Sequence, residues 1–259
     1  MQPWAALRAW AVVKWVCLPN ILLLAAATAS VGSGGSGHAA LWRHVLVEPP
    51  WLKTTVTQTP RNLSLIPCGA ACIRQDWCRL WCHEAPRGCL LTSLTASASY
   101  EPAQPDGALS CYTSRPPDLT VGANITSSPH FHPDIKRREN LVDGIFSSDM
   151  YDCAIVNTDN GVTPWFLLDL GATVPVSEVV LVTQPNEKAP YFFKDVEVRV
   201  GDVEMSGDFT TYQLLGTYPG PAQPEQTVVL RPAAPITGRY VSIQRTTVPA
   251  LQIAHLEIR

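Results

Sequence analysis

Residues that could carry out acid–base or metal chemistry are spread thinly along this chain. Its six histidines occur singly, apart from the pair His130 and His132, which lies between Pro129 and Pro133 in a segment typical of a loop. The sequence contains no GxSxG, HExxH or Walker-type phosphate-binding motif. A catalytic site needs acid, base or nucleophilic groups that converge on one point. The sequence therefore predicts a protein that is not an enzyme.

Cysteine spacing is the strongest chemical signal in the chain. Most of its cysteines gather between residues 68 and 111, without the C-x2-C pairs that bind zinc. Such a cluster in an exported chain predicts disulfide bonds, although spacing alone leaves the pairing open. The clustered residues are Cys68, Cys72, Cys78, Cys82, Cys89 and Cys111. Cys153 stands apart, and we expect it to be either buried and inert or paired with another molecule.

Residues 1–29 have the pattern of a secretory signal peptide. Arg8 and Lys14 supply positive charge, residues 21–27 form a short apolar core, and Ala27-Thr28-Ala29 suits cleavage. We expect cleavage after Ala29 and a secreted, extracellular protein. The alternative is a retained membrane anchor, but charged and turn-forming residues interrupt the ~20 apolar residues that a membrane span needs. After cleavage we expect no transmembrane segment.

Overall charge does not identify a partner. Charged residues make up 16% of the chain and the formal net charge is -3, so no strong field attracts the chain to nucleic acid. Two sequons, at Asn62 and Asn124, are expected to accept N-linked glycans. The partners that remain are a surface glycan or an extracellular protein.

Composition divides the rest of the chain into two modules. Residues 30–41 include the run VGSGGSG, a flexible spacer because glycine and serine keep the backbone mobile. Residues 42–113 form a cysteine-rich module. Residues 114–118 form a linker, because paired prolines remove amide donors and suit a sheet poorly. Residues 119–259 have the size of one domain.

Short elements are expected in the cysteine-rich module. Residues 64–77 predict a helix with Ser64 as its N-cap and with Cys68 and Cys72 on one face. Residues 79–81 and 88–91 are short and apolar, as strands of a small sheet are.

The second module predicts strands throughout. Runs rich in valine, isoleucine and aromatic residues recur between turn residues, which predicts an antiparallel sandwich or barrel. These runs are residues 165–169, 178–183, 195–200, 212–217, 226–230, 239–244 and 251–258. Alternation is clearest in 196–200 and 240–244, where each strand turns one face to the core and one to water.

Five ordered motifs in the second module carry a resemblance to a known family. They are NLVDG at 140–144, WFLLDLG at 165–171, VEVRVG at 196–201, GRYVSI at 238–243 and LEI at 256–258. The module resembles the discoidin (coagulation factor five/eight C-type) superfamily, and within it most closely the F-type lectins. The resemblance implies an antiparallel jelly-roll β-sandwich. Trp165 is then expected in the core, and Gly171 and Gly201 at turns.

The first module resembles a PAN/apple domain. The resemblance rests on Cys68-x3-Cys72, on the run CRLW that begins at Cys78 and on the run CLL that begins at Cys89. It implies a small disulfide-rich α+β module with the pairs Cys68–Cys89, Cys72–Cys78 and Cys82–Cys111. The whole chain is then mainly β.

The ligand residues of the F-type lectins are largely replaced in this chain. The family holds fucose with a His and with an Arg-x-Asp, but Pro185 stands at the Arg position and Glu187 at the Asp position. The His loop falls at residues 158–160. The chain is therefore not expected to be a fucose lectin.

The loop of residues 184–194 offers other ligand groups, since loops at one end of such a sandwich meet the ligand. Exposed aromatics beside lysines suit stacking on a sugar or docking on a protein or lipid headgroup. The candidate ligand residues are Glu187, Lys188, Tyr191, Phe192, Lys194 and Asp159. In the alternative reading, Tyr191 and Phe193 begin the next strand and point into the core.

The resemblance also implies a calcium ion beneath these loops, held by the oxygen ligands that a hard cation prefers. Asn140 and Asp143 stand at matching positions and Asp152 near a third. At the C-terminal end His255 replaces a family Glu, and imidazole is a poor calcium ligand. Near it, Ala254 replaces the cysteine that would pair with Cys153.

Three functions follow in order of expectation. The first is lectin-like recognition of a cell-surface carbohydrate, in innate immunity for example. The second is a protein-binding adhesion or matrix module, and the third is a structural extracellular spacer. The basic run of residues 136–138 is either a processing site or a solvated loop.

Overall fold

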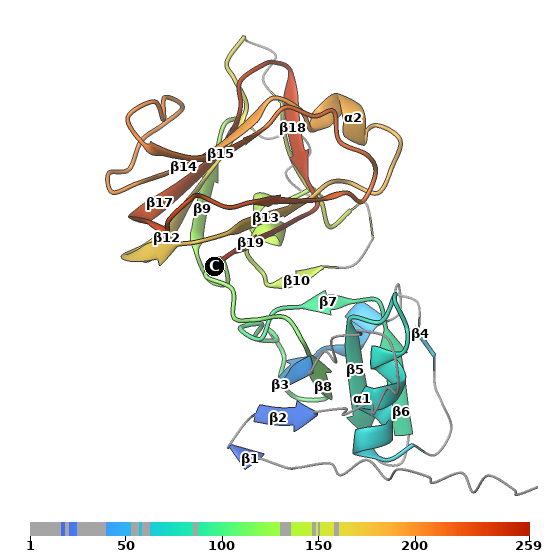
Figure 1. Ribbon diagram of the computed structural model, residues 1–259. Helices are drawn as coiled ribbons and strands as arrows, with labels where there is room; N and C mark the ends of the chain where they lie inside the picture. Colours follow the sequence, from blue (N-terminus) through green and yellow to red (C-terminus); the bar gives the residue numbers. More distant parts are fainter. Residues whose placement is uncertain are drawn as a thin grey trace, which may run out of the picture.

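The computed structural model describes residues 17–18, 21–24, 40–52, 57–58, 63–84, 88–129, 136–146, 149, 151–157 and 161–259. In Figure 1 a cysteine-rich module in blue and green lies below a β-sandwich that runs from green to red. Strands dominate both modules, so the fold is mainly β, as the sequence predicts. None of the helices in these residues is long and apolar enough to cross a membrane.

The cysteine-rich module is an antiparallel sheet with one helix, α1 (Leu65–Ile73), against β5 and β6. The strands lie in the order β1-β2-β3-β8-β5-β6-β4. Their bounds are β1 Cys17–Leu18, β2 Ile21–Leu24, β3 Ala40–Val47, β4 Thr57–Gln58, β5 Leu80–Glu84, β6 Gly88–Thr92 and β8 Leu109–Thr113. A 3-10 helix, η1 (Pro49–Leu52), follows β3. The strands β1 and β2 lie within the expected signal peptide and extend the sheet beyond β3.

The helix α1 is shorter than residues 64–77, which the sequence predicts. It ends at Ile73, because the chain turns there and the Gln75 amide donates back to the Cys72 carbonyl. Ser64 occupies the N-cap position that the sequence predicts, although its side chain makes no capping hydrogen bond.

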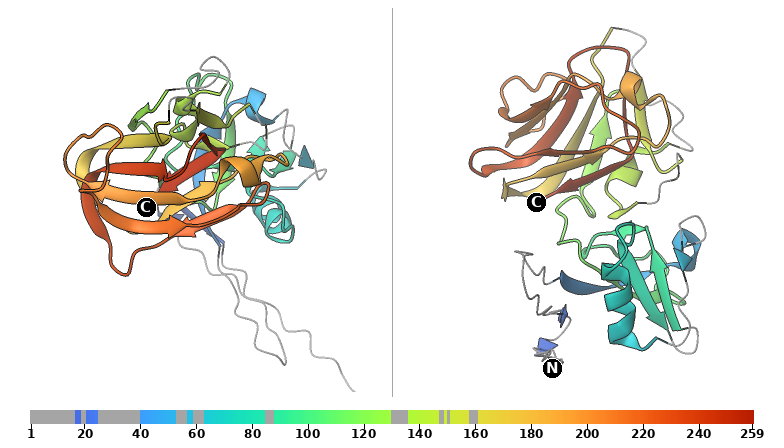
Figure 2. Two further views of the ribbon diagram at one scale, coloured as in Figure 1. Left: turned by 90° about the horizontal axis from the view of Figure 1, so that it is seen from above. Right: turned by 45° about the vertical axis from the view of Figure 1, so that its right-hand side comes forward.

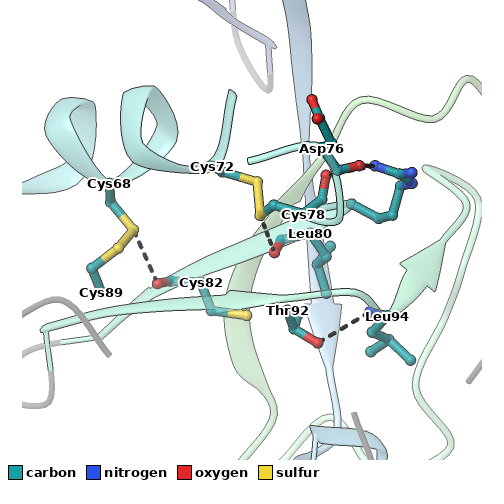
Figure 3. Close-up of a disulfide and its surroundings, with 10 residues drawn as sticks. Cys68, Cys72, Asp76, Cys78, Leu80, Cys82, Cys89, Thr92 and Leu94 are labelled. Carbon is teal, nitrogen blue, oxygen red and sulfur yellow. Dashed lines mark hydrogen bonds between the residues drawn. A yellow bond between two sulfur atoms is a disulfide. The ribbon is translucent and has the colours of Figure 1, made fainter. Parts of the chain in front are cut away.

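Three disulfides tie the helix and sheet together, as Figure 3 shows for the α1 side. They join Cys68 to Cys89, Cys72 to Cys78, and Cys82 to Cys111. These are the pairs that the PAN/apple resemblance implies. The first links α1 to β6, the second closes the turn after α1, and the third links the neighbouring strands β5 and β8.

The second module packs a five-stranded sheet against a three-stranded one, seen from two further sides in Figure 2. The strand orders are β15-β14-β17-β12-β9 and β16-β13-β19. The bounds are β9 Asn124–Ser127, β12 Trp165–Val176, β13 Val179–Val182, β14 Val196–Gly201, β15 Gln213–Tyr218, β16 Thr227–Leu230, β17 Ile236–Arg245 and β19 His255–Ile258. A separate pair joins β11 (Ala154–Asn157) to β18 (Ala250–Ile253).

The last predicted strand, 251–258, is in fact two strands. The chain breaks pairing at Ala254, so that β18 pairs with β11 while β19 pairs with β13. The short strands β9 and β11 were not predicted, because four residues are too few to show a clear period.

The sandwich core lies between the two sheets and consists of aliphatic and aromatic side chains. In β14 the predicted alternation is confirmed, since Val196, Val198 and Val200 are buried and the residues between them are half-buried. Hydrophobic burial between the layers is the main source of stability in such a fold.

Three single-residue expectations have different outcomes. Trp165 is buried, but it packs with Phe209 in a smaller cluster apart from the main core. Gly171 lies at a φ of 77°, as a turn requires. Gly201 is not in a turn but at the end of β14. A Cβ atom at this position would lie 2.3 Å from the ring of Tyr212, so close packing requires the glycine.

The two modules are joined by backbone pairing. The strand β7 (Thr95–Ala96) of the first module pairs with β10 (Ile145–Phe146) of the second. The side chain of Ile145 is buried among residues of the first module, including Leu94 and Tyr100. The sandwich therefore contributes to the core of its neighbour.

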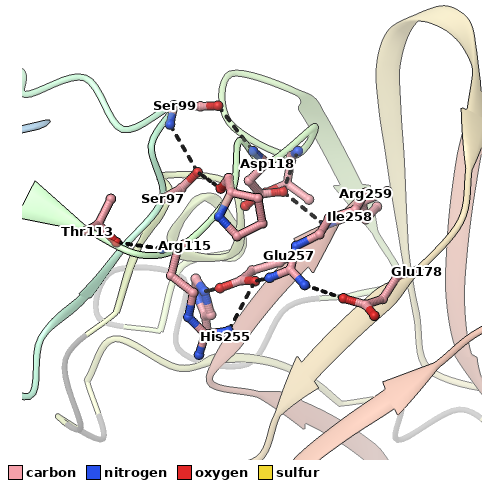
Figure 4. Close-up of polar contacts among 12 residues, drawn as sticks. Ser97, Ser99, Thr113, Arg115, Asp118, Glu178, His255, Glu257, Ile258 and Arg259 are labelled. Atoms are coloured by element: carbon pink, nitrogen blue, oxygen red, sulfur yellow. Dashed lines mark hydrogen bonds and ion pairs between the residues drawn. The ribbon is translucent and has the colours of Figure 1, made fainter. Parts of the chain in front are cut away.

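The predicted linker, residues 114–118, is held at its far end. Asp118 is buried, and its Oδ1 accepts hydrogen bonds from the amides of Thr120 and Ile258, both at 2.9 Å (Figure 4). Burial raises the pKa of this carboxyl, although the hydrogen bonds oppose that shift. The linker is thus fixed to the C-terminal strand β19.

Candidate functional site

The loop between β13 and β14 carries most of the predicted ligand residues. It folds into a single helical turn, α2 (Ala189–Phe192). Asn186 begins the turn, because its Oδ1 accepts the Lys188 amide at 2.9 Å. The Phe193 amide ends it by donating to the Ala189 carbonyl. Figure 1 shows α2 in orange at the end of the sandwich away from the cysteine-rich module.

The three aromatic residues of this loop divide between solvent and core. Tyr191 is 55% exposed, and Phe192, half-buried, meets its ring edge-on at 5.0 Å. Phe193 is fully buried and packs against Tyr218. Tyr191 therefore faces solvent, as a ligand-binding role requires, and Phe193 points into the core, as the alternative reading expects.

Arg245 holds this loop in place through hydrogen bonds to backbone carbonyls. It is buried, and its guanidinium donates to the Tyr191 carbonyl at 3.0 Å and to the Ala250 carbonyl at 2.6 Å. Its backbone amide donates to the Pro164 carbonyl at 3.0 Å. Burial lowers the pKa of this arginine, but a guanidinium stays charged at neutral pH. Arg245 thus contacts the segments of Tyr191 and Ala250 through its guanidinium and that of Pro164 through its backbone.

Three segments contact Arg245 through Pro164, Tyr191 and Thr247, and we call these segments, residues 161–164, 186–193 and 246–249, the loop cluster. Each carries one exposed hydrophobic side chain, namely Val162, Tyr191 and Val248, at 49%, 55% and 45% exposure. The sequence reasoning missed both valines. Their signal was an apolar residue beside a turn-forming glycine or proline, which a search for strands passes over.

The other predicted ligand residues differ in their surroundings. Glu187 and Lys188 are exposed beside Tyr191, on the same turn. Lys194 is half-buried beyond Phe193, and its stem lies against Gly220. Asp159 lies outside the described residues. The structure thus groups Glu187, Lys188, Tyr191 and Phe192, with Lys194 behind them.

The predicted calcium ligands lie elsewhere in the sandwich. Burial and the nearby charge of Asp152 raise the pKa of Asp143 to about 7, a repulsion that a cation would relieve. The Asn140 amide nitrogen donates to the Tyr151 carbonyl at 3.3 Å. Among the described residues, no group of three or more His, Cys, Asp or Glu side chains could hold a metal. Calcium therefore stays a prediction.

His255 contributes to a different contact. Its Nε2 lies 3.2 Å from Glu257 Oε1, and its ring stacks on Phe146. Cys153 is a buried free thiol whose pKa burial raises to about 12. Because Ala154 pairs with Ile253 in the antiparallel β11–β18 ladder, Cys153 comes next to Ala254, where the family has its second cysteine.

The predicted sites of modification are the two sequons and the basic run of residues 136–138. Asn124 is exposed at the start of β9, and Asn62 lies outside the described residues. In the basic run, Arg137 and Arg138 both form ion pairs with Glu139. Cleavage of that run stays a prediction.

Several solved structures are similar to the second module. A mutant of the lectin binding domain of lectinolysin, complexed with Lewis b, has 17% identity and a TM-score of 0.43 over 54% of this chain and 94% of that one. A fucose binding module of Streptococcus pneumoniae has 12% identity and a TM-score of 0.42 over 55% and 96%. The family 32 module of NanJ from Clostridium perfringens, in complex with galactose, has 13% identity and a TM-score of 0.40 over 52% and 92%.

Sequence comparison identifies the family of the second module. No curated protein sequence matches the chain. A family model described as the F5/8 type C domain matches residues 124–256. This match spans β9 to β19, so it includes both sheets and the loop cluster. Because it covers more than half of the sequence, the chain belongs to the F5/8 type C domain family.

Proposed function

We propose that this protein is a non-enzymatic recognition protein that binds a cell-surface glycan through the loop cluster. The observation that carries the proposal is the exposed ring of Tyr191, which Phe192 contacts edge-on and whose backbone carbonyl is bonded to the buried Arg245. A rigid aromatic face suits stacking on the apolar side of a sugar ring. Glu187 and Lys188 beside it supply an acceptor and a donor for hydroxyl groups.

A glycan array probed with the secreted protein tests this proposal. Tyr191→Ala is expected to weaken binding of the preferred glycan about tenfold, in line with the ~1–3 kcal/mol of stacking on one ring seen in nucleic-acid sites. Tyr151→Ala is the matched control, because its ring is 56% exposed. Tyr151 lies before Ala154, at the end of β11 that is farther from the loop cluster. Equal loss in both variants, or no glycan bound at all, would contradict the proposal.

A second candidate function is docking on an extracellular protein. It is favoured by Val162 and Val248, whose exposed side chains offer no hydrogen bonds to a sugar. On this reading Val248→Ser abolishes capture of a protein partner from a cell surface, and enzymatic removal of surface glycans leaves that capture unchanged. Glycan binding predicts the reverse result in both measurements.

Calcium binding is proposed for Asn140, Asp143 and Asp152. The bound ion would neutralise the two carboxylates and stiffen the chain before β11. The melting temperature is expected to rise with calcium chloride and to fall with chelator. Asp143→Asn should remove this dependence, whereas Asp106→Asn, an exposed carboxyl of the first module, should keep it. A melting curve insensitive to both reagents contradicts the site.

We also propose that the chain is secreted after cleavage at Ala29, that the first module is a PAN/apple domain and that Asn124 is glycosylated. Cleavage would remove β1 and β2 and leave β3 at the edge of the sheet, still paired with β8. Mass spectrometry of the protein from culture medium tests the start of the mature chain and the occupancy of Asn124. An intact N-terminus in the medium would exclude cleavage.

A further inference from the structure

A pocket of about 290 Å³ lies between the two modules, apart from the loop cluster. Thr95 and Phe146, which pair across the β7–β10 junction, both line it. The wall on the first-module side also includes Trp77 and Arg79 of that module and Arg115 of the linker, and the sandwich wall also includes Glu225, Thr227 and His255. Its volume is close to the ~300 Å³ at which small-ligand sites begin. The junction of the modules therefore forms a hollow large enough for one monosaccharide.

The pocket is positively charged on its first-module side. Arg79 is exposed and donates from Nη1 to the carbonyls of Asp76 and Cys78, and Arg115 keeps Nη1 3.7 Å from Glu257 Oε2. A guanidinium has five N–H donors, and these contacts leave most of them for a ligand. Of the residues that line the pocket, only Glu225 carries a negative charge, and it is exposed. Two guanidinium groups facing one space favour a carboxylate, whose planar oxygens they can bind in pairs.

His255 lines the same pocket with a side chain that is almost fully buried. Its side chain is 3% exposed, and Nε2 contacts the carboxylate of Glu257 (Figure 4). Because a carboxylate only accepts, Nε2 carries the proton in this contact, and in that tautomer Nδ1 is an acceptor. Among the described residues, Nδ1 is buried without a hydrogen-bond partner. Such an atom is costly unless a donor, for example a ligand hydroxyl, reaches it.

Trp77 supplies an apolar wall. Its indole is half-buried and lines the pocket from the turn after α1. Two residues with hydroxyl groups, Thr95 and Thr227, line the same pocket. Aromatic, hydroxyl and guanidinium groups around one small space form a set that matches an acidic sugar.

We propose that this pocket binds a hydroxylated carboxylate of monosaccharide size, namely the uronic or sialic acid residue of an acidic glycan. Arg79 and Arg115 bind the carboxylate. His255 Nδ1 accepts a hydrogen bond from a ring or side-chain hydroxyl, and Trp77 packs on the apolar face. The site is separate from the loop cluster, so it stands whether or not the loops bind a glycan.

Calorimetry or ligand-observed NMR on the full secreted chain tests this proposal with four probes: sodium glucuronate, N-acetylneuraminate, glucose and N-acetylglutamate amide. At least one sugar acid is expected to bind about tenfold more tightly than glucose or the glutamate derivative. Arg79→Ala should weaken that binding about tenfold, since it removes charge-assisted hydrogen bonds. Arg74→Ala is the matched control, an exposed arginine of the same module that does not line the pocket.

A variant that strengthens binding excludes misfolding as the cause of a loss. Glu225→Gln removes the opposing charge and is expected to tighten sugar-acid binding about threefold. Tyr191→Ala should leave it unchanged, which separates this pocket from the loop cluster. Equal effects of Arg79→Ala and Arg74→Ala, equal binding of glucose or the glutamate derivative, or no binding of either sugar acid would overturn the proposal.

Discussion

The two modules of this chain hold their cores together in different ways. The sandwich buries aliphatic side chains from both sheets. Cys153, the cysteine that the structure describes in the sandwich, is unpaired. In the cysteine-rich module the buried Trp81 instead packs with Trp42 at 5.9 Å and is stacked on Tyr112 at 4.2 Å, in a cluster that includes the cysteines of two disulfides.

Size explains this difference. A small module buries too little apolar surface to offset the conformational entropy of its chain, and cross-links reduce that entropy in the unfolded state. The larger sandwich has enough buried surface without them. We therefore expect the first module to respond to reductant and the second to respond to changes in packing.

Phe166→Ala is expected to have the largest effect, and it tests the packing side of the comparison. Phe166 is fully buried in the sandwich core, so truncation should reduce the free energy of unfolding by about 4 kcal/mol. Chemical denaturation, followed separately for each module by hydrogen exchange, measures the change. A loss of the same size in the first module would show that the two modules unfold as one unit.

Replacing both Cys82 and Cys111 by serine tests the disulfide side. Their bond spans 29 residues of sequence, and its loss should destabilise the first module by about 3 to 4 kcal/mol. The same replacement at Cys72 and Cys78, which lie 6 residues apart, should cost about 2 kcal/mol. Equal losses from both pairs would contradict an entropic origin.

The carboxyl group of Glu257 should make the free energy of unfolding depend on pH. Burial alone would favour the neutral form, but the hydrogen bond with His255 and the charges of Arg115 and Arg259 outweigh it and lower the pKa of Glu257 to about 2. Glu178 also faces this group through its ion pair with Arg259. Since the folded-state pKa is lower than the ordinary value of 4.5, the stabilisation is fully present above pH 4.5 and is lost as the pH falls through about 2.

The expected loss across this window is about 3 kcal/mol. Melting temperatures of the protein and of Glu257→Gln, measured from pH 6 to pH 2, give the difference that belongs to this carboxyl. Parallel curves for the two proteins would show that Glu257 does not contribute.

Changes at Cys153 are expected to have the smallest effect. They test whether the sandwich depends on an accessible thiol. Because burial raises its pKa to about 12, a maleimide should not label it in the folded protein. Denaturant should expose it for labelling, and Cys153→Ala should change the free energy of unfolding by no more than about 1 kcal/mol. Rapid labelling of the native protein, or a dimer that reductant separates, would show that Cys153 is accessible.

Much of the fold could be predicted from local patterns. Alternation identified β14, and the spacing of Cys68, Cys72 and Cys78 carried the resemblance that implied the pairing. These features depend on neighbours a few residues apart. The break at Ala254 could not be seen in this way, because both halves of 251–258 are apolar and only their partners in the fold differ. In β17 the strand lies where the sequence predicts it, but residues 240–243 are all buried, so the face that was expected to meet water is covered by other parts of the fold.

The candidate sites were harder to predict, because they depend on contacts between distant segments. The exposure of Tyr191 follows from the bond between its carbonyl and Arg245, which comes 54 residues later. The pocket between the modules brings Arg79 near His255, and no sequence pattern connects the two. Such contacts are set by the topology of the strands.

The pairing of β7 with β10 also decides where the protein can be divided. A protein expressed from residue 119 onward would keep both sheets of the sandwich but would leave Ile145 without the side chains that bury it, and the backbone of β10 without a partner. The first module expressed alone would have a hole where Ile145 belongs. An exchange of modules at the proline-rich linker would therefore succeed only with a sandwich that presents a similar strand, so the two halves are expected to have been inherited together.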